Sequence, residues 1–388
     1  MIRSAVVVVC LFAAVYSCKD KYEAPVSSPK TGYLVVEGVI NAGTGPTIIM
    51  LGRSVPLPER TQVKETGALV QVEGSNSSVV TLTEVSNGVY RHAQLTLANG
   101  VKYRLKIKTM TGNEYVSEFQ DVKITPVIDS VSWTRDAKGV DIFIHAQDAQ
   151  NKTRYYKWEF EETWQYHSRF STFLRYKVTP IPNRPPLVEL VVNDNGTTID
   201  TIYKCWQGAT STEIEIGSTA KLSQDRVYLP IQHIEQASLK LSVLYSIYVN
   251  QTALSKRGYE FFERMKKNSE SVGSVFDPQP SEIRGNIVCT NDPSEIVIGF
   301  VEVSSTVNKR VFIDNRNLPG WGYRQSCVEP ITILNNPDSV LASYFQGQLP
   351  VGIVSTKPNG SIDYYAAAEG ICVDCTLRGS NKKPPFWP

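Results

Sequence analysis

The segment Val101-Lys102-Tyr103-Arg104-Leu105-Lys106-Ile107-Lys108 decides the fold class, because apolar and cationic residues alternate in it without interruption. Alternate side chains of a β-strand point to opposite faces, so this strand has one apolar face and one charged face. The turn residues Thr111-Gly112-Asn113 come next, and residues 114–118 follow as a hairpin partner. The sequence therefore predicts a fold of half-buried antiparallel strands.

The region upstream has the same character. Four further strands are expected, with turns at Asn87-Gly88 and Asn99-Gly100. They cover Leu34–Ile40, Thr47–Leu51, Ala68–Glu73 and Val79–Glu84. About seven short strands in so few residues are typical of a small sandwich. We expect an immunoglobulin-like or transthyretin-like domain over residues 33–125.

A second β pattern follows the stiff connector at residues 125–129. Alternation at Val140, Ile142, Ile144 and Ala146 and again from Leu239 to Val249 predicts further strands. Ser255 can cap one helix, expected at residues 255–268, because aromatic residues follow it at helical spacing. We interpret residues 126–388 as a larger, fibronectin-III-like domain with a short helical insertion.

One predicted strand is unusually aromatic. Tyr156, Trp158 and Phe160 alternate with charged residues, and burial in a core is the expected role of Trp158 and Phe160. Farther along lie four aromatic residues that precede a proline-rich stretch at residues 180–186. These four are candidates for contact with a partner or ligand, although packing is an open alternative. They are Trp164, Tyr166, Phe170 and Phe173.

The cysteines can form disulfides in an oxidising compartment. Seven are present, and five of them lie in the second half of the chain. These five disulfide candidates are Cys205, Cys289, Cys327, Cys372 and Cys375. Two disulfides and one free thiol are the largest set they allow, in fifteen possible arrangements. We predict that Cys372 or Cys375 bonds to a cysteine far upstream, with Cys327 favoured; a metal or redox site at residues 372–375 is the alternative.

The N-terminus resembles a bacterial lipoprotein signal. A basic start, an uncharged run from Ala5 to Tyr16 and the ending Val15-Tyr16-Ser17-Cys18 fit a signal peptide over residues 1–17 and lipidation of Cys18. Residues 18–32 have the composition of an extended tether. The charged patch after Cys18 resembles an export signal for the outer face of the outer membrane. We therefore expect a lipid-anchored outer-membrane protein, exposed on the cell surface rather than on the periplasmic side.

Composition and motifs argue against several activities. With 40 basic and 38 acidic residues, the chain has no net field that would attract nucleic acid. The four histidines, His92, His145, His167 and His233, are scattered and match no metal or nucleophile motif. Glu159, Glu161 and Glu162 could mimic a glycosidase pair, but adjacent acids on one strand are more often a solvated stripe. We expect no enzyme activity, no cofactor and no bound metal.

Several segments resemble a Bacteroidetes lipoprotein family catalogued as a domain of unknown function, number 4249. The resemblance extends over nearly the whole mature chain and includes residues 34–38, 155–159, 276–280, 285–287, 297–300, 309–313, 372–375 and 383–387. Members are commonly encoded beside TonB-dependent receptors, which implies an accessory role in nutrient uptake. The resemblance implies no catalytic residues.

Three functions follow as hypotheses. The first is a non-enzymatic binding subunit of a TonB-dependent receptor, with an unidentified ligand. The second is a structural subunit of an envelope or secretion assembly. The third, and the least favoured, is a surface hydrolase, which would need a nucleophile with its base or paired carboxylates at working distance.

Overall fold

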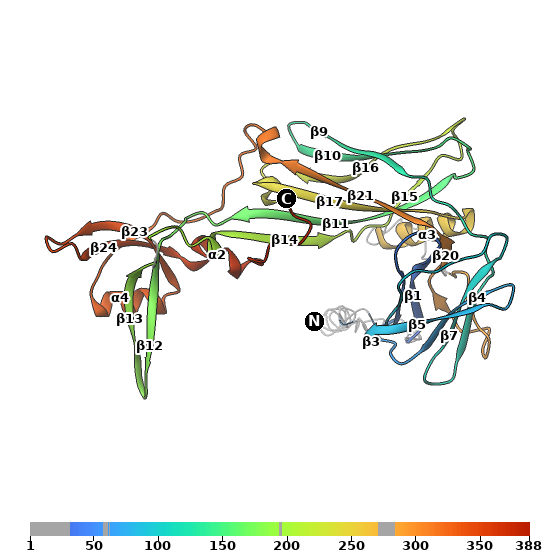
Figure 1. Ribbon diagram of the computed structural model, residues 1–388, viewed down its shortest axis with the longest axis horizontal. Helices are drawn as coiled ribbons and strands as arrows, with labels where there is room; N and C mark the ends of the chain where they lie inside the picture. Colours follow the sequence, from blue (N-terminus) through green and yellow to red (C-terminus); the bar gives the residue numbers. More distant parts are fainter. Residues whose placement is uncertain (1–31, 57–60, 62, 194–195, 271–283) are drawn as a thin grey trace, which may run out of the picture.

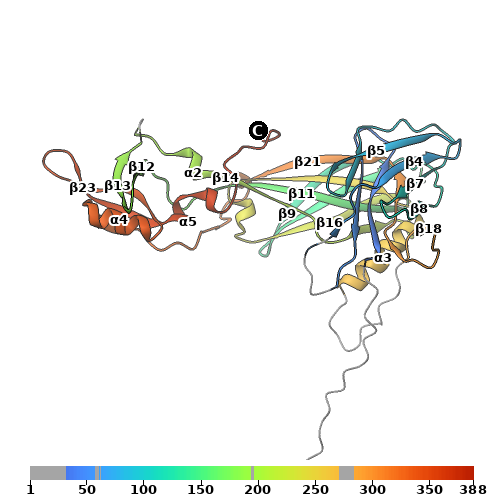
Figure 2. The ribbon, with the colours of Figure 1, turned by 90° about the horizontal axis from the view of Figure 1, so that it is seen from below.

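The computed structural model describes residues 32–56, 61, 63–193, 196–270 and 284–388. The predicted signal peptide and Cys18 lie outside the described residues, as do residues 18–31 of the predicted tether. The chain forms an elongated molecule with an N-terminal sheet at one end, a central pair of sheets, and a distal lobe at the other end (Figures 1 and 2). Strands account for most of the secondary structure, so the prediction of a mainly β fold is confirmed.

The N-terminal sheet has eleven strands in the order β18-β8-β7-β4-β5-β6-β2-β1-β19, with β20 beside β1 and β3 beside β2. Their bounds are β1 Leu34–Asn41, β2 Thr47–Arg53, β3 Val63–Lys64, β4 Leu69–Gly74, β5 Val79–Ser86, β6 Val89–His92, β7 Tyr103–Lys108, β8 Glu114–Ser117, β18 Ile287–Cys289, β19 Val297–Ile298 and β20 Glu302–Ser304. The sheet curls around one apolar core and forms a sandwich-like, nearly closed layer. Each strand expected in residues 34–118 is present.

Strand β7 shows why the alternating pattern folds this way. Tyr103, Leu105 and Ile107 are buried, whereas Arg104 lies on the opposite face and pairs with Glu73 of β4 at 2.8 Å. Burial of one face of each strand fixes the register, because a slip by one residue would expose the apolar side chains.

Residues 287–304 return to this sheet after almost the whole central region has intervened. β19 and β20 both pair with β1 in parallel, and β18 extends the other edge by pairing with β8. The boundary expected between residues 125 and 126 separates β1 to β8 from the central sheets. The strands β18 to β20 lie after this boundary in the sequence but belong to the N-terminal sheet. The N-terminal sheet is thus completed by a segment from the second half of the chain.

The central body consists of two facing sheets. The strands β9 (Ile128–Arg135), β10 (Gly139–Asp148) and β16 (Asp225–Glu235) form one. The strands β11 (Tyr155–His167), β14 (Lys204–Thr210), β15 (Glu215–Ser218), β17 (Leu244–Ala253) and β21 (Thr306–Asp314) form the other. A shared apolar core fills the space between them. The strand expected from residue 239 begins only at Leu244, because residues 239–241 form a 3₁₀ turn.

Helix α3 (Lys256–Glu270) lies beside the junction between the central body and the N-terminal sheet (Figure 1). Ser255 caps it as predicted, with its Oγ accepting a hydrogen bond from the backbone N–H of Gly258 at 3.0 Å. Within the described ranges, no helix has the length and apolar composition needed to cross a membrane.

The distal lobe is a third unit that the sequence did not reveal. It contains β12 (Leu174–Ile181), β13 (Arg184–Val192), β22 (Ile331–Leu334), β23 (Gln348–Thr356), β24 (Ile362–Glu369) and helix α4 (Pro337–Phe345). Its small core comprises Leu174, Val188, Val340, Tyr365 and Ala367. The proline-rich stretch forms the end of the β12–β13 hairpin, where Asn183 has a positive φ of 56°. Asparagine tolerates this left-handed conformation, which permits the tight turn.

Candidate functional site in the neck and the distal lobe

Four segments connect the central body to the distal lobe, and we call them the neck: residues 168–173, 196–205, 322–330 and 370–380. Two disulfides hold the neck together. Cys205 bonds to Cys375, and Cys327 bonds to Cys372. The prediction that Cys372 or Cys375 bonds to a cysteine far upstream is therefore confirmed for both, and the favoured partner, Cys327, is bonded to Cys372. Cys289 has a free, buried thiol in the N-terminal sheet. Both disulfides join segments that are far apart in sequence, by 170 and 45 residues, so they tie the C-terminal segment to the neck.

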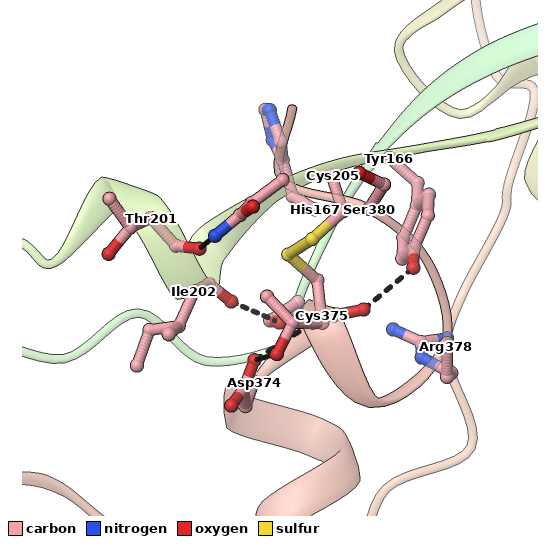
Figure 3. Close-up of a disulfide and its surroundings, with 12 residues drawn as sticks. Tyr166, His167, Thr201, Ile202, Cys205, Asp374, Cys375, Arg378 and Ser380 are labelled. Atoms are coloured by element: carbon pink, nitrogen blue, oxygen red, sulfur yellow. Dashed lines mark hydrogen bonds between the residues drawn. A yellow bond between two sulfur atoms is a disulfide. The ribbon is translucent and has the colours of Figure 1, made fainter. Parts of the chain in front are cut away.

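Hydrogen bonds surround the Cys205–Cys375 disulfide (Figure 3). The phenol of Tyr166 donates to the carbonyl oxygen of Cys375 at 2.8 Å, and the guanidinium of Arg378 lies 5.0 Å from the Tyr166 ring centroid. Burial raises the pKa of Tyr166, which keeps this phenol protonated as a donor. Short helix α2 (Asp200–Tyr203) and α5 (Gly370–Val373) flank the disulfides. The neck is a covalently closed, hydrogen-bonded unit.

The interpretation of Trp164 and Tyr166 as surface contacts is wrong. Trp164 is 8% exposed and donates to Gln207 Oε1 at 3.0 Å, and Tyr166 is fully buried. The reason is that β11 continues to His167, so the inward parity of Trp158 and Phe160 extends to these rings. Burial of Trp158 and Phe160 in the core is as predicted.

Phe170 and Phe173 lie in the neck, and both are only partly buried. The backbone N–H of Phe170 donates to the carbonyl oxygen of Cys372 at 3.0 Å, next to the Cys327–Cys372 disulfide. Phe173 packs against the core of the distal lobe. Their positions indicate a role in joining the lobe to the central body.

The distal lobe carries a large share of the exposed apolar side chains of the described residues. Ten such side chains come from its strands and helix α4, although these elements are a small part of the chain. They are Val178, Ile181, Leu187, Val192, Ile331, Leu334, Phe345, Ile353, Val354 and Tyr364. Exposed apolar side chains that cluster mark interaction surfaces more often than scattered ones do. The distal lobe is the strongest candidate for a contact surface.

The hairpin tip, defined as residues 177–187, concentrates this feature. β12 and β13 project from the lobe (Figure 1), and Val178, Ile181 and Leu187 are 39%, 41% and 44% exposed. Val178 lies opposite the buried Val188 and shares its face, whereas Leu187 lies opposite Thr179 on the other face, so apolar side chains are exposed on both faces of the hairpin beyond the lobe core. The sequence contained a signal for this site, since valine, isoleucine and leucine surround the prolines, but the prolines suggested an irregular loop.

Three of the residues considered for catalysis, Glu162, His233 and His145, have structural partners. Glu162 is buried, with its carboxylate 2.7 Å from Lys240 Nζ and 2.6 Å from the Tyr245 hydroxyl, which donates to it. His233 Nδ1 lies 2.7 Å from Asp141 Oδ1, and His145 Nε2 lies 2.7 Å from Ser132 Oγ on the same outer sheet face. In the described part of the chain, the side-chain hydrogen bond of His145 is to Ser132, and no cluster of three metal-ligating side chains occurs.

A comparison with known protein families finds one family model that matches this chain. A model described as "Domain of unknown function (DUF4249)" matches residues 19–310, which include the N-terminal sheet, the β12–β13 hairpin and the central body up to the middle of β21. No curated protein matches the chain. Of the four disulfide-bonded cysteines, Cys205 lies within the family match. The other three, Cys327, Cys372 and Cys375, lie beyond its end.

Proposed function

The chain belongs to the DUF4249 family, and we propose that it is a non-enzymatic, lipid-anchored binding subunit of a TonB-dependent nutrient-uptake receptor. Cys18 would carry the lipid at the outer membrane, and the distal lobe would contact the receptor. The observation that carries the proposal is the hairpin tip, where apolar side chains extend beyond the core of a lobe held by two disulfides.

The character of the hairpin tip supports binding to a protein surface. Large apolar side chains exposed to water favour burial, at roughly 25 cal/mol per Å² of apolar area. Protein interfaces typically combine such an apolar centre with a polar rim. At the hairpin tip Lys177 and Arg184 are exposed beside the apolar residues and could supply that rim.

The neck supports the same function in another way. Binding is stronger when the contacting element is already held in its bound position, since less conformational freedom is lost. The disulfides and the Tyr166 hydrogen bond fix the neck to the central body, so the lobe is presented in one orientation. The lobe lies at the opposite end of the molecule from the N-terminal sheet, which directly follows the predicted tether in sequence (Figure 2).

Affinity purification of the native, detergent-extracted lipoprotein tests the proposal. We expect a TonB-dependent receptor to co-purify with the wild-type chain. The variant Val178→Thr/Ile181→Thr/Leu187→Thr should weaken this co-purification by at least about tenfold, or ~1.4 kcal/mol. Threonine keeps the branched shape that β-strands favour while it removes apolar surface from the hairpin tip.

A matched control removes the same number of exposed apolar side chains elsewhere. Leu69, Val79 and Val85 of the N-terminal sheet are 46%, 52% and 57% exposed, so Leu69→Thr/Val79→Thr/Val85→Thr should leave co-purification unchanged. Equal loss in both variants would contradict a contact at the hairpin tip. Recovery of envelope or secretion components in place of a receptor would favour a structural subunit instead.

The anchor has a separate test. A Cys18→Ala chain should appear in the soluble fraction or stay as a precursor, because acyl chains on this cysteine would supply the membrane attachment. Its recovery in the outer-membrane fraction after a carbonate wash would show that another segment holds it there.

A further inference from the structure

A cleft of about 770 Å³ lies at the junction of the central body and the N-terminal sheet, far from the distal lobe. Three segments line it: residues 122–127, residues 147–155, and residues 253–256 at the start of helix α3. Its volume falls within the range of small-molecule sites, roughly 300 to 1,000 Å³.

Backbone hydrogen bonds hold all three segments in place. Lys123 bonds through its N–H to Val303 and through its carbonyl to Ser305, both at 2.9 Å, so the first segment is fixed to the N-terminal sheet. The N–H of Leu254 donates to the carbonyl oxygen of Tyr155 at 2.8 Å, which joins the other two segments. The cleft is therefore preformed rather than created by folding around a ligand.

Four cationic side chains line the cleft: Lys123, Lys152, Arg154 and Lys256. The guanidinium of Arg154 is directed to the loop at residues 219–222, because its Nη1 donates to the carbonyl oxygens of Thr219 and Leu222 at 3.4 and 3.3 Å. Lys256 makes only a long, exposed contact with Glu260, at 3.8 Å. Such an exposed pair contributes little, so the charge of Lys256 is available to a ligand, as is that of the exposed Lys152.

Asp148 is the one carboxylate among the lining residues, and it accepts hydrogen bonds from the backbone of its own loop. Its two oxygens accept backbone hydrogen bonds from Gln150, Lys152 and Thr153 at 2.8 to 2.9 Å. Partial burial opposes its charge, but these donors outweigh that effect and lower the pKa of Asp148. Asp148 thus shapes the loop at residues 148–153 and is ionised, so it offsets one of the four positive charges and leaves the lining residues with a positive excess.

The cleft also has exposed apolar walls. Ile124 and Val127, on the connecting segment, are 70% and 66% exposed, and Leu254 and Ala253 line the same space. A hydrophilic anion alone would leave these side chains in contact with water. A ligand with both an apolar frame and a negative group would use both features.

We propose that this junction cleft binds an organic anion, a small molecule that carries a carboxylate, sulfonate or phosphate group on an apolar or aromatic frame. The cations would attract the anionic group, and Ile124 and Val127 would pack against the frame. This site is separate from the hairpin tip, so it does not depend on the proposed receptor contact.

Two fluorescent dyes with one frame test the proposal. Anilinonaphthalene sulfonate carries a sulfonate, and N-phenylnaphthylamine is its neutral counterpart. With the full-length chain carrying Cys18→Ala, which avoids detergent, we expect saturable sulfonate-dye binding that is about tenfold tighter than neutral-dye binding at low salt and weakens as salt is added. Equal affinity for the two dyes would overturn the proposal.

Charge reversal locates the site. Lys152→Glu/Lys256→Glu should weaken sulfonate-dye binding about tenfold or more and leave neutral-dye binding unchanged. Both lysines are exposed, so the fold should be unaffected. Lys138→Glu/Lys382→Glu changes the net charge equally at exposed positions outside the cleft and should bind as the wild type does. Binding unaltered in the cleft variant, or weakened equally in both, would overturn the assignment to this cleft.

Discussion

The N-terminal sheet and the distal lobe are both built from short strands, but different forces hold them. The N-terminal sheet encloses a core of nineteen buried residues, whereas the lobe core contains five. The N-terminal sheet has no disulfide among its described residues, and both disulfides lie where the lobe joins the central body. Small cores bury too little apolar area to offset the entropy of folding, so covalent links take over part of that role.

The two regions also differ in how their apolar side chains are placed. In the N-terminal sheet, Leu105 and Ile107 are fully buried and stabilise the fold. In the lobe, the hairpin tip leaves Val178, Ile181 and Leu187 partly exposed, where they add little to stability. In the proposed function this surface serves binding, and the disulfides contribute to the stability of the lobe that carries it.

Removal of the Cys205–Cys375 disulfide should have the largest effect. Its cysteines are 170 residues apart. In the chain-entropy model, closure of such a loop stabilises by about 4 to 5 kcal/mol. In Cys205→Ala/Cys375→Ala, hydrogen exchange measured by mass spectrometry should accelerate in β24 and the neck, while β7 keeps its wild-type protection. Equal acceleration in β7 would show that the two regions unfold together. The disulfide would then stabilise the whole chain rather than the lobe and the neck.

A core substitution in the N-terminal sheet should give the reverse pattern. Leu105 is fully buried, so Leu105→Ala leaves a cavity and should lower the free energy of unfolding by about 3 kcal/mol. Exchange should accelerate in β4 and β7 and stay unchanged in β24. The exposed Leu69→Ala in the neighbouring strand serves as the control, with a much smaller effect expected.

The sequence predicted the strands of the N-terminal sheet because each buries one face and therefore alternates. It could not predict β18 to β20, which are two or three residues long and pair with partners over a hundred residues away. Such short strands show no periodicity, and only the tertiary fold places them. The same limit applies to the pairing of Cys205 with Cys375, since spacing alone did not select among the arrangements.

The candidate site was harder to predict than the fold. Alternation identified Trp158 and Phe160 as core residues, and the same rule applied to Trp164 and Tyr166, because one strand contains all four. The nearby proline-rich stretch obscured this continuity. Prolines also concealed the β12–β13 hairpin, whose strands tolerate them because it stands apart as a two-stranded sheet with free edges. The exposed surface was therefore near the predicted one, but on different residues.

The buried carboxyl of Glu302 gives a smaller, pH-dependent effect. It lies on β20 and accepts hydrogen bonds from the N–H and hydroxyl of Ser255 at 2.8 and 2.6 Å, while its Oε2 has no partner in the described residues. Burial raises its pKa despite these bonds. A raised folded-state pKa means that the stabilisation is complete below the unfolded value, about 4.3, and is lost as pH rises through the folded value.

Glu302→Gln removes this titration. Relative to the wild type, the variant should gain stability as pH rises from 4 to 7.5, because only the wild type must bury a charge there. Thermal unfolding at several pH values measures this difference. A difference that stays constant with pH would show that burial does not raise the pKa of Glu302 above its value in the unfolded chain.

The hairpin tip should give the smallest effect on stability, which makes it the sharpest test of the comparison. Val178, Ile181 and Leu187 each keep about two-fifths of their surface exposed, and they end a hairpin whose core contacts are made farther back by Leu174 and Val188. Surface substitutions of this kind change the free energy of unfolding by about 0.5 kcal/mol or less each. Val178→Thr/Ile181→Thr/Leu187→Thr should therefore unfold within a few degrees of the wild type while it loses the proposed partner. A large fall in the unfolding temperature would mean that these side chains stabilise the lobe, and that the apolar surface of the lobe serves its own fold as the N-terminal core does.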